Sequence, residues 1–207
     1  MTAPRVDATA VIERLSAARV EGRSGLAFDA DGTLWAGDVG EDVFEWACAR
    51  ELLRSEAAEP LAVAATAHGT SRDGSPSRVA SALYAAYRRG TVPELEMCEI
   101  MTWCYAGFED TELRDVARHA FQERNLGGRR REILMPIFEW AAKETLRVVV
   151  VSASPIPIVE EGLRALGVEI SGLAAALAAT SGGRIAPEMA QPLPYGPEKP
   201  VAGRRIT

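Results

Sequence analysis

The chain has little lysine and no excess of basic residues. Its 207 residues include only two lysines, Lys143 and Lys199, and 23 Lys or Arg residues face 29 Asp or Glu residues. The net charge of −6 argues against a protein that binds nucleic acid by electrostatic attraction. Chemistry that needs an ammonium group therefore has few candidates in this sequence.

Long apolar runs and cysteine motifs are also absent. No segment approaches the roughly 20 apolar residues that span a bilayer. Asp7, Glu13 and Arg14 interrupt the N-terminal region, which is unlike a signal peptide. The three cysteines are odd in number and have no CxxC spacing, which favours buried free thiols over a disulfide framework or a zinc site. We therefore expect a cytoplasmic protein without a membrane partner.

One apolar run of the chain ends in two acids. Residues 25–30 are typical of a buried strand, and Asp29 and Asp31 lie at its C-terminal end, before a Gly32-Thr33 turn. Open α/β sheets bind ligands at this end of their strands. Residues i and i+2 of an extended segment share a face. We therefore expect Asp29 and Asp31 to address one substrate, with one carboxylate attacking and the other handling protons.

A second apolar run indicates a parallel sheet. Residues 146–151 are nearly all β-branched and predict a fully buried strand that leads into Ser152. Helical patterns precede and follow it, over residues 132–143 and 156–166. The order strand, helix, strand predicts parallel strands with helices on the faces of the sheet.

The remaining C-terminal part contains many turn residues. Residues 168–185 predict a short strand and a turn at Gly182-Gly183. The proline-rich segment 187–200 predicts a loop that no helix follows.

Helical patterning fills the region between the two predicted strands. Apolar stripes from about residue 39 to 130 predict several helices, and residues 68–76 predict a loop. This insert begins directly after the acidic turn, so it is placed to cover the active end of the sheet. The predicted fold is α/β, with a core from residues 1–37 and 132–207 and a helical cap from residues 38–131.

Three polar motifs follow one another in a specific order. They are Asp29-x-Asp31-Gly-Thr after the first strand, Ser152 at the end of the second, and Lys199 within Gly-Pro-Glu-Lys. This order resembles the haloacid dehalogenase superfamily of phosphohydrolases and includes three of its four motifs. The resemblance covers most of the chain and implies a Rossmann-like parallel-sheet core with an inserted helical cap.

The resemblance implies a role for each motif. Asp29 would attack phosphorus and form an aspartyl-phosphate, and Asp31 would protonate the leaving alkoxide and later activate water. Ser152 would bind a phosphate oxygen, and Lys199 would neutralise charge on the nucleophile and the phosphoryl group. The further groups expected at the phosphate are those of Gly32, Thr33 and Ala153. Asp29 and the backbone carbonyl of Asp31 would hold a Mg²⁺ ion.

Asp38 has two interpretations. Phosphoserine-phosphatase-like members of the superfamily place an acid a few residues past the first motif, where it meets a substrate amino group. Asp38 takes that place, although those members more often carry Glu there, and the long helical insert resembles their cap. An acid at this position is equally suited to the positive N-terminal end of a helix. The sequence leaves both interpretations open.

The fourth motif of the superfamily has no counterpart in this sequence. It is an acidic cluster that supplies further magnesium ligands, whereas no Asp occurs beyond Asp115. We therefore expect a chain that stops short of the fourth motif.

The leading hypothesis is Mg²⁺-dependent hydrolysis of a small phosphorylated metabolite. One alternative is a phosphotransferase on the same scaffold, and another is a catalytically silent binding protein, which the missing acids favour. Asp31 disfavours a dehalogenase, because dehalogenation has no leaving alkoxide to protonate.

Overall fold

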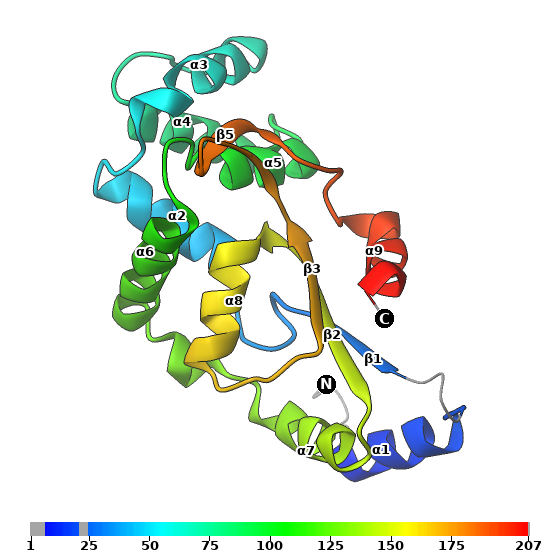
Figure 1. The fold of residues 1–207 in the computed structure, drawn as a ribbon. Coiled ribbons are helices and arrows are strands. Elements are labelled where there is room, and N and C mark those ends of the chain that lie inside the picture. The colour runs from blue at the N-terminus through cyan, green and yellow to red at the C-terminus, as the bar shows by residue number, and fades with distance from the viewer. Residues whose placement is uncertain (1–6, 21–24, 207) are drawn as a thin grey trace.

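Three parallel strands form the sheet at the centre of the molecule (Figure 1). The computed structural model describes residues 7–20 and 25–206. Its sheet has the order β1–β2–β3, with β1 at Gly25–Asp29, β2 at Arg147–Pro155 and β3 at Gly172–Ala176. Parallel neighbours need crossover connections, and helices provide them. The predicted α/β fold is therefore confirmed.

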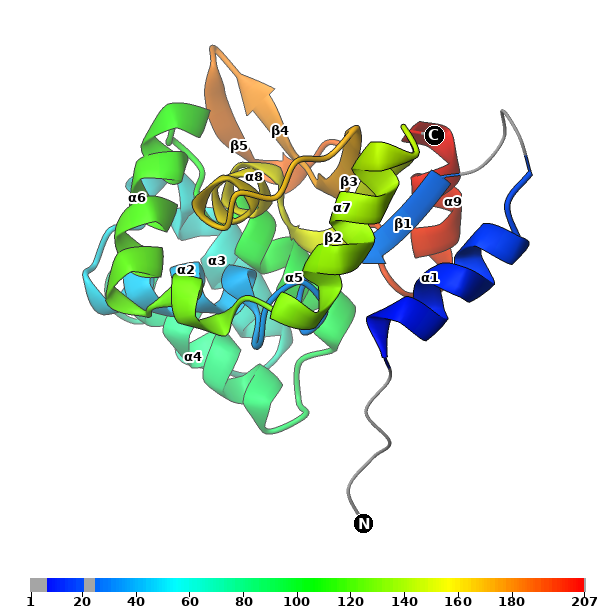
Figure 2. The ribbon, with the colours of Figure 1, turned by 90° about the horizontal axis from the view of Figure 1, so that it is seen from below.

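Helices cover both faces of this sheet (Figure 2). On one face lie α7 (Met135–Lys143) and α8 (Ile156–Ala165), and on the other lies α9 (Lys199–Ile206). Val148 to Val151 of β2 are all buried, as expected for a strand with both faces covered. Phe28 of β1 stacks on Phe138 of α7 with ring centroids 4.8 Å apart. The N-terminal helix α1 (Ala8–Ala17) packs against α7.

The region between β1 and β2 is helical, as predicted. Its helices are α2 (Val39–Ala49), α3 (Ala58–Ala67), α4 (Pro76–Arg88), α5 (Glu94–Trp103) and α6 (Asp110–Glu123). Short 3₁₀ turns occur at Ser55–Ala57, Leu126–Arg129, Glu132–Leu134 and Gly196–Glu198. The fully buried side chains of Leu61, Leu83 and Ile100 hold these helices together. Because α5 contacts β2, the helical region reaches the sheet.

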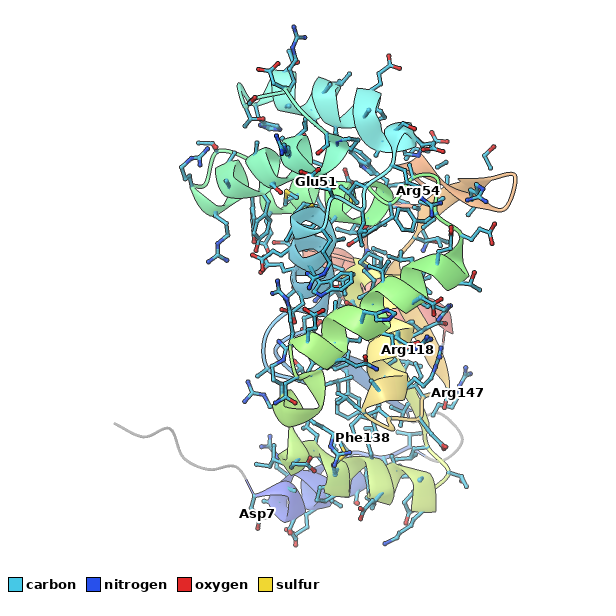
Figure 3. The ribbon with its side chains drawn as sticks, turned by 90° about the vertical axis from the view of Figure 1, so that its left-hand side faces the viewer. Asp7, Glu51, Arg54, Arg118, Phe138 and Arg147 are labelled. Carbon is cyan, nitrogen blue, oxygen red and sulfur yellow. The ribbon has the colours of Figure 1, made fainter. Side chains whose placement is uncertain are left out.

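Helix α6 of the helical region packs along α8 of the sheet layer. Arg118 Nε donates to Glu161 Oε1 at 3.0 Å, and Arg114 pairs with Glu160 one turn away. Figure 3 shows Arg118 on the side of α6 that faces α8. The carboxyl group of Glu161 is almost fully buried, and Arg118 and Arg164 offset its charge, with Arg164 Nη1 2.9 Å from Glu161 Oε2.

The two chain segments that join sheet and helical region run side by side. Trp35 and Arg130 form an antiparallel bridge. Ala36 N–H donates to Arg129 O, and Arg131 N–H donates to Leu34 O, each at 2.9 Å. This ladder lies beside the expected boundaries at residues 37/38 and 131/132. The division into core and cap remains a prediction. In that division, the chain passes from core to cap and back again at this ladder.

A β-hairpin connects β3 to the C-terminal segment. Its strands β4 (Ala178–Ser181) and β5 (Arg184–Met189) turn at Gly182-Gly183, where the sequence predicts a turn. The hairpin reaches the helical region, since Ile185 N–H donates to Phe108 O at 2.8 Å and Gly107 N–H to Ile185 O at 2.9 Å.

The prediction of a loop over residues 187–200 is wrong at both ends of that segment. The prediction that no helix follows is also wrong. Residues 187–189 complete β5, and α9 begins at Lys199. Pro200 lies in the first turn of this helix, where the missing N–H of proline has no intrahelical partner to lose. The segment therefore ends in a helix that packs on β2 and β3.

The structure also bears on the cysteines and on the expected absence of a membrane span. Cys48, Cys98 and Cys104 are free thiols, and the first and last of them are buried. Within the part of the chain that the structure describes, no helix is long and apolar enough to cross a membrane.

Candidate active site

The end of β1 and the start of α9 bring two motif residues together. Lys199 Nζ lies 2.5 Å from Asp29 Oδ1. The side chains of Asp29 and Lys199 are 40% and 33% exposed, so a ligand can reach the pair. No described residue donates a hydrogen bond to the second oxygen, Asp29 Oδ2. The pair thus leaves one carboxylate oxygen open beside a fixed positive charge.

Asp31 has four hydrogen-bond donors around its carboxylate. Its Oδ1 accepts from Trp35 Nε1 at 2.9 Å and from the backbone N–H of Val39 at 2.8 Å. Its Oδ2 accepts from Ser154 Oγ at 2.8 Å and from Ser152 Oγ at 3.1 Å. A carboxylate has about four lone-pair sites, so these donors fix its orientation.

The strand includes only the first of the two acids. β1 ends at Asp29, and Asp31 follows in an isolated bridge with Trp35. Each acid has its own hydrogen-bond partners. That the two side chains share one face and address one substrate remains a prediction.

The end of β2 directs two serines to Asp31. Ser152 and Ser154 are two residues apart, and both are buried, with 1% and 6% of their surface exposed. The register between β2 and β3 shifts between Val151 and Pro155, and such irregularities often re-aim side chains beside active sites. The sequence prediction missed Ser154, although its i+2 spacing from Ser152 could have indicated it.

The groups expected at the phosphate have partners of their own. Ser152 Oγ donates to Asp31 and accepts from Ser154 N–H at 3.0 Å. The backbone N–H of Gly32 donates to Gly37 O at 2.9 Å, and that of Thr33 to Ala30 O at 3.1 Å. The half-buried residue between the two serines is Ala153. The phosphate-binding roles of Gly32, Thr33, Ser152 and Ala153 remain predictions.

Asp38 begins helix α2. Its Oδ1 accepts from the backbone N–H of Glu41 at 2.8 Å, which is the geometry of an N-cap. Burial and the nearby carboxylate of Asp31 raise the pKa of Asp38 from 3.8 to about 7. The helix-start interpretation of Asp38 is therefore confirmed, and its substrate role remains a prediction.

The carboxylates near the site extend onto the helical region. Burial, followed by the charges of Asp38, Glu94 and Glu41, raises the pKa of the Cys98 thiol on α5 to about 12. Burial, followed by the charge of Glu41, also raises the pKa of the Tyr84 hydroxyl. Negative charge therefore gathers where α2 and α5 approach the end of the sheet.

The site offers two protein oxygen donors for a magnesium ion. No group of three or more His, Cys, Asp or Glu side chains among residues 7–20 and 25–206 is arranged to hold a metal. Asp29 offers an exposed carboxylate, and Asp31 offers a backbone carbonyl. Mg²⁺ in phosphoryl-transfer sites is often held by one or two carboxylates together with substrate phosphate and water. The two donors suit that arrangement.

The paired carboxylate and lysine lie at the carboxyl end of a parallel sheet, under a helical region, which is where open α/β proteins bind their ligands. The chain matches the model of the haloacid dehalogenase-like hydrolase family over residues 26–206 and belongs to that family.

Its structure is similar to a crystal structure of a protein of unknown function from Bordetella pertussis Tohama I. The TM-score is 0.62 at 16% sequence identity, and the match covers 86% of this chain and 71% of the other. This likeness supports the fold alone. No curated protein matches the sequence.

Proposed function

We propose that this chain hydrolyses the phosphomonoester of a small metabolite through an aspartyl-phosphate on Asp29. The contact between Lys199 and Asp29 Oδ1, with Oδ2 left open, is the observation that carries the proposal. Asp29 is exposed and paired with a cation, whereas Asp31 is enclosed by four donors. Two carboxylates in such different environments suit two different roles. We expect the protein to act in the cytoplasm.

In the first step, Asp29 Oδ2 attacks phosphorus and forms a bond to it. Lys199 offsets negative charge at Asp29 Oδ1 and on the phosphoryl oxygens. The bond from phosphorus to the leaving oxygen breaks, and Asp31 gives a proton to that oxygen. This proton takes the place at Asp31 Oδ2 that the Ser152 hydroxyl leaves when it binds the phosphate. The products of this step are the free alcohol and an acyl phosphate on Asp29.

In the second step, the acyl phosphate is hydrolysed. The carboxylate of Asp31 takes a proton from a water molecule as its oxygen attacks phosphorus. The bond between phosphorus and Asp29 breaks, which releases inorganic phosphate and restores the carboxylate. Asp31 is again protonated and ready for the next substrate.

Mg²⁺ would be held by the carboxylate of Asp29 and the backbone carbonyl of Asp31. When bound, it would add positive charge beside the transferred phosphoryl group.

The acids of the helical region support a substrate that carries an ammonium group. Asp38, Glu41 and Glu94 each lie near enough to the Cys98 thiol to raise its pKa. A cationic group next to the phosphate would be attracted to them. This pattern supports a phosphoserine-phosphatase-like specificity, in which Asp38 meets the substrate amine.

The test is phosphate release from O-phosphoserine, glycerol phosphate and p-nitrophenyl phosphate, with Mg²⁺ or with EDTA. We expect Mg²⁺-dependent release, fastest from O-phosphoserine, and loss of release in Asp29→Asn. Asp115→Asn is the matched control, because Asp115 is exposed on α6 and pairs only with Arg118. An Asp29→Asn variant as active as the parent protein would exclude the proposed nucleophile.

A catalytically silent binding protein is the second candidate. The absence of a three-ligand acidic group in the described part of the chain favours it. Calorimetric titration with Mg²⁺ and beryllofluoride separates the two candidates. Binding of beryllofluoride that depends on Asp29, without turnover of any phosphomonoester, would favour the silent protein.

A further inference from the structure

The single proton of the Ser152 hydroxyl already has a partner. Its Oγ donates to Asp31 Oδ2 at 3.1 Å and accepts from Ser154 N–H at 3.0 Å. A hydroxyl has a single proton to donate. If Ser152 binds a substrate phosphate, as proposed above, it must therefore release Asp31.

Ser154 can keep the same oxygen of Asp31 in place. Its Oγ donates to Asp31 Oδ2 at 2.8 Å, which is shorter than the contact from Ser152. The residue is 6% exposed. Gly40 of α2 lies directly against its hydroxyl, since a Cβ built at Gly40 would be 2.7 Å from Ser154 Oγ. Ser154 is thus enclosed between the acid and the first turn of α2, and this enclosure limits its freedom to turn elsewhere.

Close packing, and not backbone conformation, accounts for the glycine at position 40. Gly40 lies in a helix and has no positive φ, so the backbone conformation does not require glycine. Glycine is less favourable than alanine inside a helix. The close approach to Ser154 explains the glycine, because a Cβ at this position would displace the Ser154 hydroxyl.

We propose that Ser154 is the positioning residue of the general acid: it holds Asp31 Oδ2 when Ser152 turns to the substrate phosphate. This inference rests on the proposed phosphomonoesterase function. Asp31 then stays aimed at the leaving oxygen throughout the first step. Ser152 acts on substrate binding, whereas Ser154 acts on proton transfer, although both hydroxyls contact the same carboxylate oxygen.

Two aryl phosphates of nearly the same shape test this division. Phenyl phosphate has the more basic leaving group and needs protonation, whereas p-nitrophenyl phosphate needs it much less. General acid catalysis contributes on the order of 10²–10⁴-fold, and misplacing the acid removes part of that. We expect Ser154→Ala to lower the rate of phenol release in the first turnover, which precedes the water step, about tenfold or more for phenyl phosphate and less than about threefold for p-nitrophenyl phosphate. KM should be nearly unchanged for both.

Ser152→Ala is the matched comparison. It should raise KM for both substrates by a similar factor, because it removes a phosphate ligand whatever the leaving group. Ser77→Ala controls for the loss of a buried hydroxyl, since Ser77 is 1% exposed and accepts from Leu53 N–H, away from the site. Ser77→Ala should leave the rate on phenyl phosphate and the rate on p-nitrophenyl phosphate the same as in the parent protein.

Gly40→Ala gives a second route that leaves both serines intact. The added methyl group displaces the Ser154 hydroxyl, and alanine favours the helix, so the fold should tolerate it. On phenyl phosphate we expect the same loss of rate in Gly40→Ala as in Ser154→Ala. Combined with Ser154→Ala it should add little, because both changes act through one hydroxyl.

The outcomes separate the two proposals. If the parent protein hydrolyses neither aryl phosphate, the proposed function fails, and this inference fails with it. If the parent is active but Ser154→Ala and Gly40→Ala slow both substrates equally, or act on KM, only the positioning role of Ser154 is excluded.

Discussion

Lys199 Nζ contacts Asp29 Oδ1 at 2.5 Å, although 170 positions separate the two residues in the chain. Helix α9 produces this contact by packing on β2, which is the neighbour of β1, and on β3. A lone lysine in a proline-rich segment and an acid at a strand end thereby become one ion pair. The pair leaves Asp29 Oδ2 open, which is the arrangement a carboxylate nucleophile needs.

Replacing Lys199 should slow the reaction far more than it weakens the fold. Lys199→Met removes the charge that offsets Asp29 Oδ1 and the phosphoryl oxygens. We expect kcat/KM on p-nitrophenyl phosphate to fall on the order of 10²–10³-fold. Lys143→Met is the matched control, because Lys143 is the other lysine and lies exposed at the end of α7. Equal activity in the two variants would contradict a role for Lys199.

The indole of Trp35 should matter through its N–H group. Trp35→Phe removes the 2.9 Å hydrogen bond to Asp31 Oδ1 from a fully buried side chain. We expect kcat to fall about tenfold and the free energy of unfolding to fall by roughly 1–3 kcal/mol. Trp46→Phe is the comparison, since Trp46 Nε1 is buried without a partner among the described residues. The kinetic and urea-unfolding difference between the two variants isolates the bond to Asp31.

The raised pKa of Asp38 predicts how stability changes with pH. Between about pH 4 and 7 the folded chain still holds a proton on Asp38 that the unfolded chain has released. The free energy of unfolding therefore falls as pH rises through this window and levels off above it. Asp38→Asn keeps a good N-cap but cannot titrate.

The Asp38→Asn variant should therefore gain stability relative to the parent as pH rises from 4 to 8. We expect a relative gain on the order of 2 kcal/mol. Urea unfolding of both proteins at pH 4 and pH 8 measures it. A difference that does not change with pH would mean that Asp38 has an ordinary pKa.

Arg54 should stabilise the segment between α5 and α6, to which Ile185 of the β4–β5 hairpin is hydrogen-bonded. It donates to Gly107 O at 2.6 Å, pairs with Glu112 at 2.8 Å, and lies 4.0 Å over the ring of Phe108. Figure 3 shows Arg54 beside the hairpin. Arg54→Ala should lower the free energy of unfolding by about 1–3 kcal/mol.

Arg78→Ala is the control for Arg54→Ala. Arg78 is 74% exposed and pairs with Glu51 on the surface, so its loss should cost less than about 1 kcal/mol. Similar losses in the two variants would show that the contacts of Arg54 stabilise the fold no more than a surface ion pair does.

The sequence predicts the strands of the sheet better than the site that they carry. Residues 146–151 are apolar and β-branched, a local signal that both faces of a strand are buried. Ser154 has only a weak signal, its i+2 spacing from Ser152, because its hydroxyl reaches Asp31 through the irregular end of β2. Gly40 likewise looks like an ordinary helix residue until α2 packs against that strand.

In the C-terminal segment, the local sequence signal was present but misleading. Its prolines suggested a loop, because proline disfavours helix interiors. Pro200 lies in the first turn of α9, where that objection does not apply. The packing of α9 on the sheet, which no local pattern reports, stabilises this short helix and positions Lys199.

The central claim is that Asp29 becomes phosphorylated, and borohydride trapping tests it most directly. The protein is mixed with p-nitrophenyl phosphate and Mg²⁺, quenched with sodium borohydride, digested and analysed by mass spectrometry. An acyl phosphate on Asp29 is reduced to homoserine, so we predict homoserine at position 29 in the parent protein and none in the absence of substrate. Turnover of the substrate with aspartate unchanged at position 29 would contradict the account.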